Sequence, residues 1–159
     1  MKSGSIYPII CLGLVIYSQQ TLAHSQSGAL NDNPAQLLGN TANTVDYYQV
    51  TCSSDGSGTA PDGLITRIKD LTPGSLPRVS VHAQKDGVTS PGYIASSSTD
   101  ETDNDSNFSP WGAVAGGPGV YRVLVTKEGY GNEVYNMEAH CMTYSAVETG
   151  TGILQIQDQ

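Results

Sequence analysis

Apolar and polar residues alternate along most of the chain from residue 45 onward. The alternation is clearest in VDYYQVTC (residues 45–52) and EVYNMEAHCMT (residues 133–143). Successive side chains of a strand point to opposite faces, so one face of each segment is predicted to be buried. The residues on these two faces are Asp46, Tyr48, Val50 and Cys52 in the first segment and Tyr135, Met137, Ala139 and Cys141 in the second.

Further short segments of strand character follow between clusters of turn-forming residues. They cover residues 64–71, 78–84, 111–115, 120–127 and 153–156. Gly, Pro, Asp and Ser gather between them, as is typical of turns. Six to eight short strands separated in this way predict an all-β fold, an antiparallel β-sandwich or jelly roll forming a single domain over residues 45–159. We expect the segments flanking EGYGN (residues 128–132) to pair as a hairpin.

The N-terminal region has a different pattern. Lys2 precedes an apolar run over residues 6–17, and Thr21-Leu22-Ala23 offers small residues at a cleavage site. These features predict a secretory signal peptide over residues 1–23, since the run is too short to span a bilayer. Residues 24–44 are polar and have little periodicity, and we expect them to form a flexible arm.

Cleavage after Ala23 would remove Cys11 and leave one pair of cysteines, Cys52 and Cys141. An even pair in an exported domain predicts a disulfide. Both residues belong to the apolar faces of their strands, as a disulfide inside a sandwich requires. The sequence therefore predicts a protein that is exported to the periplasm or the extracellular space.

Charge narrows the range of partners. The chain holds 7 Lys and Arg against 15 Asp and Glu, which gives a net charge of −8. Phosphate binding needs a basic face, so this composition argues against nucleic-acid partners. The same charge argues against anionic membranes, and we expect no membrane insertion once the signal peptide is removed.

Three segments resemble the bacterial pre-peptidase C-terminal (PPC) domain. They are Val45-Asp46-Tyr47-Tyr48, GPGVYRVLV (residues 117–125) and NEVYNMEAHC (residues 132–141). The resemblance implies a small secreted β-sandwich associated with calcium, with an accessory or binding role. The Cys52/Cys141 pair departs from that family's pattern.

A calcium site is the first candidate for chemistry. Residues 96–110 are the most polar stretch, and we expect them to form a surface loop. The candidate oxygen ligands are Asp100, Asp103, Asp105 and Asn107. An EF-hand is excluded, because Phe108 stands where a glycine is needed and Val114 where a glutamate is needed. A solvated acidic loop is the alternative interpretation.

A copper site is the second candidate. His24 would be the mature N-terminus, and its amine and imidazole together with His82 or His140 suit copper. The alternative is that all three are ordinary terminal or surface residues.

Exposed aromatic residues are the third candidate. Tyr130 at a turn and Trp111 beside Pro110 are candidates for a ligand platform, because flat rings with polar tips suit glycans and protein surfaces. The alternative for Trp111 is a packing role under the adjacent loop. No G-x-S-x-G motif is present, and we expect no catalytic site.

These observations predict a secreted, non-catalytic module that binds protein or polysaccharide surfaces, with calcium as a candidate ordering ion. A copper-binding protein is one alternative. The other is a self-assembling surface or fibre subunit, whose N-terminal arm would add a strand to a neighbouring sheet. The sequence leaves the oligomeric state open.

Overall fold

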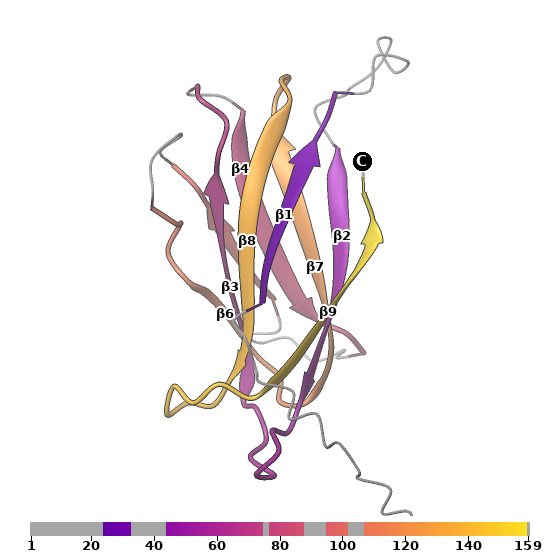
Figure 1. Cartoon of the computed structure of the whole chain (residues 1–159), viewed down its shortest axis with the longest axis vertical. Coiled ribbons are helices and arrows are strands. Elements are labelled where there is room, and N and C mark those ends of the chain that lie inside the picture. The colour runs from indigo at the N-terminus through magenta and orange to yellow at the C-terminus, as the bar shows by residue number, and fades with distance from the viewer. Residues whose placement is uncertain (1–23, 33–43, 75–76, 88–94, 102–106, 159) are drawn as a thin grey trace, which may run out of the picture.

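The computed structural model describes residues 24–32, 44–74, 77–87, 95–101 and 107–158, and within them the protein is an all-β sandwich (Figure 1). The predicted signal peptide lies outside these residues. No helix in the described part of the chain has the length and hydropathy to cross a bilayer. The predicted fold class is confirmed.

Two antiparallel sheets face each other. The four-stranded sheet has the order β1-β8-β3-β6, and the five-stranded sheet has the order β5-β4-β7-β2-β9. The strands are β1 (His24–Leu30), β2 (Val45–Ser53), β3 (Gly63–Asp70), β4 (Arg78–Lys85), β5 (Ala95–Thr99), β6 (Gly112–Ala115), β7 (Gly119–Glu128), β8 (Glu133–Met142) and β9 (Gly150–Gln157).

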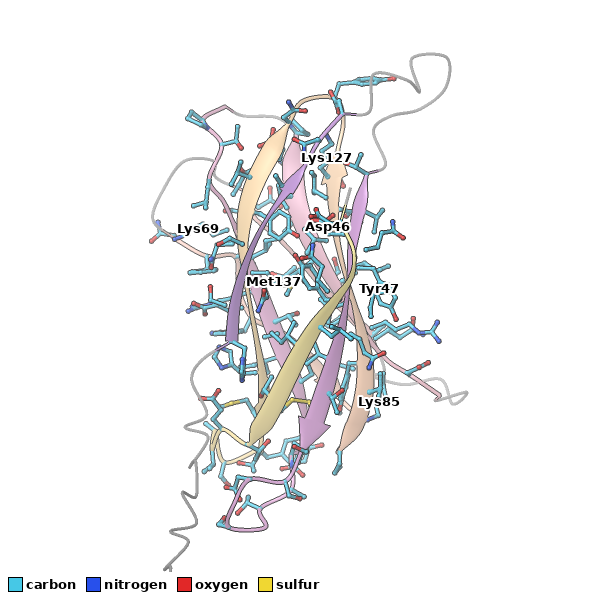
Figure 2. All side chains as sticks on the ribbon, turned by 45° about the vertical axis from the view of Figure 1, so that its right-hand side comes forward. Asp46, Tyr47, Lys69, Lys85, Lys127 and Met137 are labelled. Carbon is cyan, nitrogen blue, oxygen red and sulfur yellow. A yellow bond between two sulfur atoms is a disulfide. The ribbon has the colours of Figure 1, made fainter. Side chains whose placement is uncertain are left out.

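The core lies between the sheets and is built from the predicted faces. Every second residue of β2 from Asp46 to Cys52 is buried, and so is every second residue of β8 from Tyr135 to Cys141. The fully buried aromatic residues are Tyr48, Tyr121 and Tyr135. Figure 2 shows Asp46 and Met137 between the sheets, whereas Tyr47 projects away from them.

The predicted disulfide is confirmed. Cys52 of β2 and Cys141 of β8 are bonded, with 5.4 Å between their Cα atoms. Because β2 and β8 belong to different sheets, the bond joins the two layers directly. It lies inside the core, where both residues are almost completely buried.

The predicted hairpin is wrong. β7 pairs with β2 and β4, and β8 pairs with β1 and β3, so the two strands lie in different sheets. Both edges of β7 are already occupied, which leaves no place for β8 beside it. The connection crosses from one sheet to the other, and Gly129 and Gly131 adopt φ angles of 114° and 134° in it. Such angles favour glycine strongly.

The flexible-arm prediction is wrong for residues 24–30, which form β1 and pair with β8 along their whole length. This segment is ordered by backbone pairing, which cannot be predicted from the periodicity of its side chains. Leu30 is completely buried at the end of the strand. Gly28 lies over Tyr135, where a Cβ atom would stand 2.3 Å from the tyrosine hydroxyl. The rest of the predicted arm, residues 33–43, is outside the described residues.

The predicted surface loop over residues 96–110 is wrong in its first part. Residues 95–99 form β5, which pairs with β4. Ser98 is buried, and its hydroxyl donates to the Pro110 carbonyl at 2.5 Å and lies 2.9 Å from the Ser109 hydroxyl. These hydrogen bonds allow a polar segment to enter the sheet.

Candidate functional site: a groove on the five-stranded sheet

A groove of about 740 Å³ lies on the outer face of the five-stranded sheet. It crosses β5, β4, β7 and β2, which are neighbours in the sheet, although only β4 and β5 follow each other in the sequence. The side chains that give it its chemistry are Tyr47, His82, Gln84, Ser97, Arg122 and Leu124. Ala83, Ala95 and Ser96 complete the lining.

Strand register arranges these side chains in two rows across the sheet. In the first row Ser97 pairs with His82, His82 with Leu124, and Leu124 with Tyr47. The second row contains Ala95, Gln84 and Arg122, and it continues beyond the groove to Gln49 and Leu154. Small side chains on β5 and larger ones on β7 and β2 give the face its hollow shape.

Two of the polar side chains are held by neighbours. The His82 Nε2 atom lies 3.1 Å from the Thr126 hydroxyl, within the same face. The Arg122 guanidinium pairs with the Asp86 carboxylate at 2.7 Å, which offsets its charge. The groove therefore presents hydrogen-bonding groups in defined positions with little net charge.

The groove combines apolar and polar groups. Leu124 is 37% exposed and lies next to the half-buried Tyr47 ring, so the floor of the groove is apolar on this side. His82, Gln84 and Ser97 add donors and acceptors. None of the described lining residues is an Asp, Glu or Cys. This part of the lining therefore offers no carboxylate and no thiol, and its polar groups are imidazole, amide, hydroxyl and guanidinium.

The predicted platform residues do not come together. Tyr130 is 68% exposed, as predicted for a turn, and it precedes the first residue of β8. Trp111 is 43% exposed and lies beside His140, near the last residue of β8. Nearly the whole length of β8 separates the two aromatic side chains.

Trp111 belongs to a cluster on the outer face of the four-stranded sheet. The Arg67 guanidinium lies 4.2 Å from the Trp111 ring centroid and 4.3 Å from that of Phe108. Arg67 also forms an ion pair with Glu138 at 2.6 Å. The His140 ring packs edge-on against Trp111. These groups satisfy one another, which favours a structural role for Trp111.

The three histidines of the copper hypothesis lie on three different surfaces. His82 lies in the groove of the five-stranded sheet. His140 lies on the outer face of the four-stranded sheet, with its Nδ1 atom 2.9 Å from Glu148. His24 pairs with Ala139, which is buried, so its side chain is directed to the inner side of the same sheet. The structure does not bring the three imidazoles together.

Two of the four predicted calcium ligands lie in the described residues. Asp100 is 2% exposed, and its carboxylate accepts a hydrogen bond from the Asp70 backbone amide at 2.8 Å. Asn107 is exposed. Asp103 and Asp105 are outside the described residues. Within the described residues no three His, Cys, Asp or Glu side chains form a group suited to a metal, and calcium stays a prediction.

The sequence contained part of the signal for the groove. Alternation predicts that His82 points outward. The same rule predicts that Tyr47 points to the outer face, since its neighbour Tyr48 points to the core. Gln84, Arg122 and Leu124 were missed as site residues. The order β5-β4-β7-β2 brings them together, and local alternation carries no information about this order.

Comparisons with known proteins do not add a function to this geometry. No model of a known protein family matches the chain, and no curated protein is similar enough in sequence to count as a match. The groove, the disulfide and the N-terminal sequence pattern are therefore the features of the molecule that bear on its function.

Proposed function

We propose that this protein is an exported, non-catalytic module that binds a neutral polysaccharide chain in the groove of the five-stranded sheet. The observation that carries the proposal is the double row of side chains, in which an aromatic ring and an exposed leucine stand beside imidazole, amide and hydroxyl groups. Sugars present apolar C–H faces and polar hydroxyls together, and this lining matches both.

The position of the groove favours a polysaccharide over a peptide. Peptides bind β-sheets mainly by adding a strand to an edge, where backbone hydrogen bonds are available. This groove lies across the face of the sheet, with three of its four strands in interior positions. Side chains make nearly all of its accessible surface, which suits a ligand recognised through its hydroxyls.

The charge of the groove favours a neutral ligand. Arg122 is the one Lys or Arg among the described lining residues, and its ion pair with Asp86 lowers its attraction for an external anion. The net charge of −8 also opposes polyanions over longer distances. Acidic polysaccharides are therefore poor candidates.

Export is part of the proposal and has separate support. The disulfide requires an oxidising compartment for its formation, and residues 1–23 have the pattern of a signal peptide. Mass spectrometry of the protein recovered after secretion would test this directly. We expect an N-terminus at His24 and an intact disulfide. A retained N-terminal segment would contradict it.

The binding test uses soluble neutral oligosaccharides, namely the cello-, xylo-, manno- and chito-oligosaccharide series, measured by calorimetry. We expect at least one series to bind, and we expect Tyr47→Ala to weaken that binding at least tenfold, or about 1.4 kcal/mol. Tyr130→Ala is the matched control, because Tyr130 is exposed and lies outside the groove. Equal losses in both variants, or no binding tighter than ~1 mM in any series, would refute the proposal.

A further inference from the structure

Strand β9 forms an open edge of the five-stranded sheet. It pairs with β2 on one side, and in the described part of the chain no strand lies on its other side (Figure 1). An edge of this kind presents backbone N–H and C=O groups in the spacing that another strand needs.

β9 lacks two of the usual devices that protect an edge, proline and charged side chains, and its pairing with β2 shifts register only near its C-terminal end, between Tyr47 and Tyr48 of β2. Its eight residues, GTGILQIQ, include no proline and no charged side chain. Leu154 and Ile156 are 58% and 49% exposed. A long, neutral edge strand with exposed β-branched and aliphatic residues is a site for strand addition.

The other three edges are less suited to this role. β5 has five residues and β6 has four, which limits the number of hydrogen bonds that either could make. β1 is longer, but HSQSGA before Leu30 is polar or small and offers little apolar surface. The contrast singles out β9.

We propose that β9 pairs antiparallel with β9 of a second copy of this chain across a two-fold axis, which joins the two five-stranded sheets into one. A neutral strand can pair with itself without placing like charges opposite one another. The nearest charged residue is Asp158, directly after the strand. A parallel pair would set the two Asp158 side chains side by side, whereas an antiparallel pair centred on Leu154 separates them by about 27 Å at 3.4 Å per residue.

Leu154 is the natural centre of this pair. It pairs with Gln49 within its own sheet and so lies on the outer face, near the middle of β9. In a register centred there, the two Leu154 side chains would contact each other across the axis, and Gly152 of each copy would lie opposite Ile156 of the other. The exposed apolar area of both copies would be covered by this contact.

Dimerisation would place two grooves on one surface. A two-fold axis perpendicular to the sheet keeps the outer faces of both copies on the same side. The second row of side chains, which ends at Leu154, would continue into the partner copy. This consequence rests on the proposed function, because only a polymeric ligand could occupy both grooves and gain affinity by avidity.

The test is analytical ultracentrifugation of the mature, oxidised protein without saccharide. A single strand pair buries less than the ~1,600 Å² of a standard interface, so we expect a reversible dimer of micromolar or weaker affinity. Leu154→Lys should raise the dimer dissociation constant at least tenfold, because two cations would face each other at the axis. Val147→Lys is the matched control, since Val147 is 49% exposed and lies outside β9, and we expect no change.

A cross-linking experiment covers the case of a weak dimer. Under oxidising conditions the Leu154→Cys variant should form a disulfide-linked dimer, and Val147→Cys should not. A wild-type protein that stays monomeric up to ~1 mM, with no such cross-link, would overturn the proposal. Saccharide binding by a wild-type protein that stays monomeric would overturn this proposal alone, whereas a wild-type dimer that binds no saccharide would overturn the proposed function alone.

Discussion

The two ends of the core are closed by different chemistry. At one end a covalent bond, Cys52–Cys141, joins the sheets. At the other end the Tyr135 hydroxyl donates to the Asp46 carboxylate at 2.5 Å and shares a 2.6 Å hydrogen bond with the Tyr48 hydroxyl. Figure 2 shows the disulfide near the foot of the sandwich and Asp46 in its upper half.

A buried lysine lies near each end of the core, and the two lysines have different kinds of partner. The Lys85 ammonium lies 4.2 Å from the Tyr121 ring centroid and donates to the backbone carbonyls of Gly117 and Pro118. Burial lowers the pKa of Lys85. Lys127 instead meets a carboxylate, that of Asp32, at 2.6 Å.

The two ends of the core therefore depend on different conditions. The disulfide end responds to redox state and the polar end to pH and to hydrogen-bonding partners. Burial raises the pKa values of both Tyr48 and Tyr135, so their hydroxyls stay protonated over the whole physiological range. The two tyrosines of the polar end therefore act as neutral hydrogen-bonding partners around the buried Asp46 carboxylate.

The largest expected effect comes from removing the covalent closure. The Cys52→Ser, Cys141→Ser double variant should lose about 2–5 kcal/mol of unfolding free energy, because the bond closes a long loop in the unfolded chain. The two cysteines are 89 residues apart in sequence. Urea unfolding of both proteins, with and without reductant, measures the loss. Reductant should bring the wild type to the level of the variant and leave the variant unchanged.

A double variant nearly as stable as the wild type would contradict this expectation. That result would mean that the polar network and the apolar core hold the sheets together without covalent help. A loss smaller than the one expected below for the polar end would likewise reverse the ranking of the two ends.

The two ends also differ in how far the sequence predicted them. The disulfide could be predicted because parity places Cys52 and Cys141 on the apolar faces of their strands. Parity placed Asp46 on a buried face as well, but its tyrosine partner is 89 positions away on a strand of the other sheet. The local sequence pattern indicates which residues are buried, but it does not indicate which strands pair with each other. The hairpin between β7 and β8 was therefore predicted wrongly.

The same limit applies to the groove and to β1. Outward residues such as His82 can be read from alternation, but their assembly into two rows depends on strand order. The sequence of β1 has almost no apolar periodicity, and the strand is ordered mainly by its backbone pairing with β8. Its polar sequence consequently predicted an arm.

Two tyrosine variants test one buried hydroxyl from each end of the core. Tyr135→Phe removes the donor to the buried Asp46 carboxylate and should cost about 1–3 kcal/mol of unfolding free energy. Tyr121→Phe is the matched change near the disulfide. There the hydroxyl donates to the Gly117 carbonyl at 2.7 Å, a neutral acceptor, and we expect a loss of about 0.5–1.5 kcal/mol.

Urea unfolding of the two phenylalanine variants under the same oxidising conditions measures both losses. Both tyrosines are completely buried, so the change in apolar area is the same. A larger loss for Tyr121→Phe than for Tyr135→Phe would contradict the view that the polar end depends more strongly on its hydrogen bonds.

The smallest expected effect concerns pH at the polar end. The Lys127 ammonium donates to Asp32 and to the carbonyls of Leu30 and Gly131, and so fastens the end of β1. The hydrogen bond from Lys127 lowers the pKa of Asp32 below its ordinary value of 3.8. The folded protein therefore takes up this proton less readily than the unfolded chain. The stabilisation is complete above the ordinary pKa and is lost as the pH falls through the lower, folded-state pKa.

The Asp32→Asn variant isolates this contribution, since it keeps the size of the side chain and removes its titration. Unfolding free energies of both proteins, measured from neutral pH down to about pH 2, should differ by a constant amount at neutral pH and converge in acid. Hydrogen exchange should show faster exchange in β1 of the variant at neutral pH, and no change near the disulfide. A difference that persists unchanged in acid would mean that Asp32 acts through packing, and pH sensitivity would then no longer distinguish the two ends of the core.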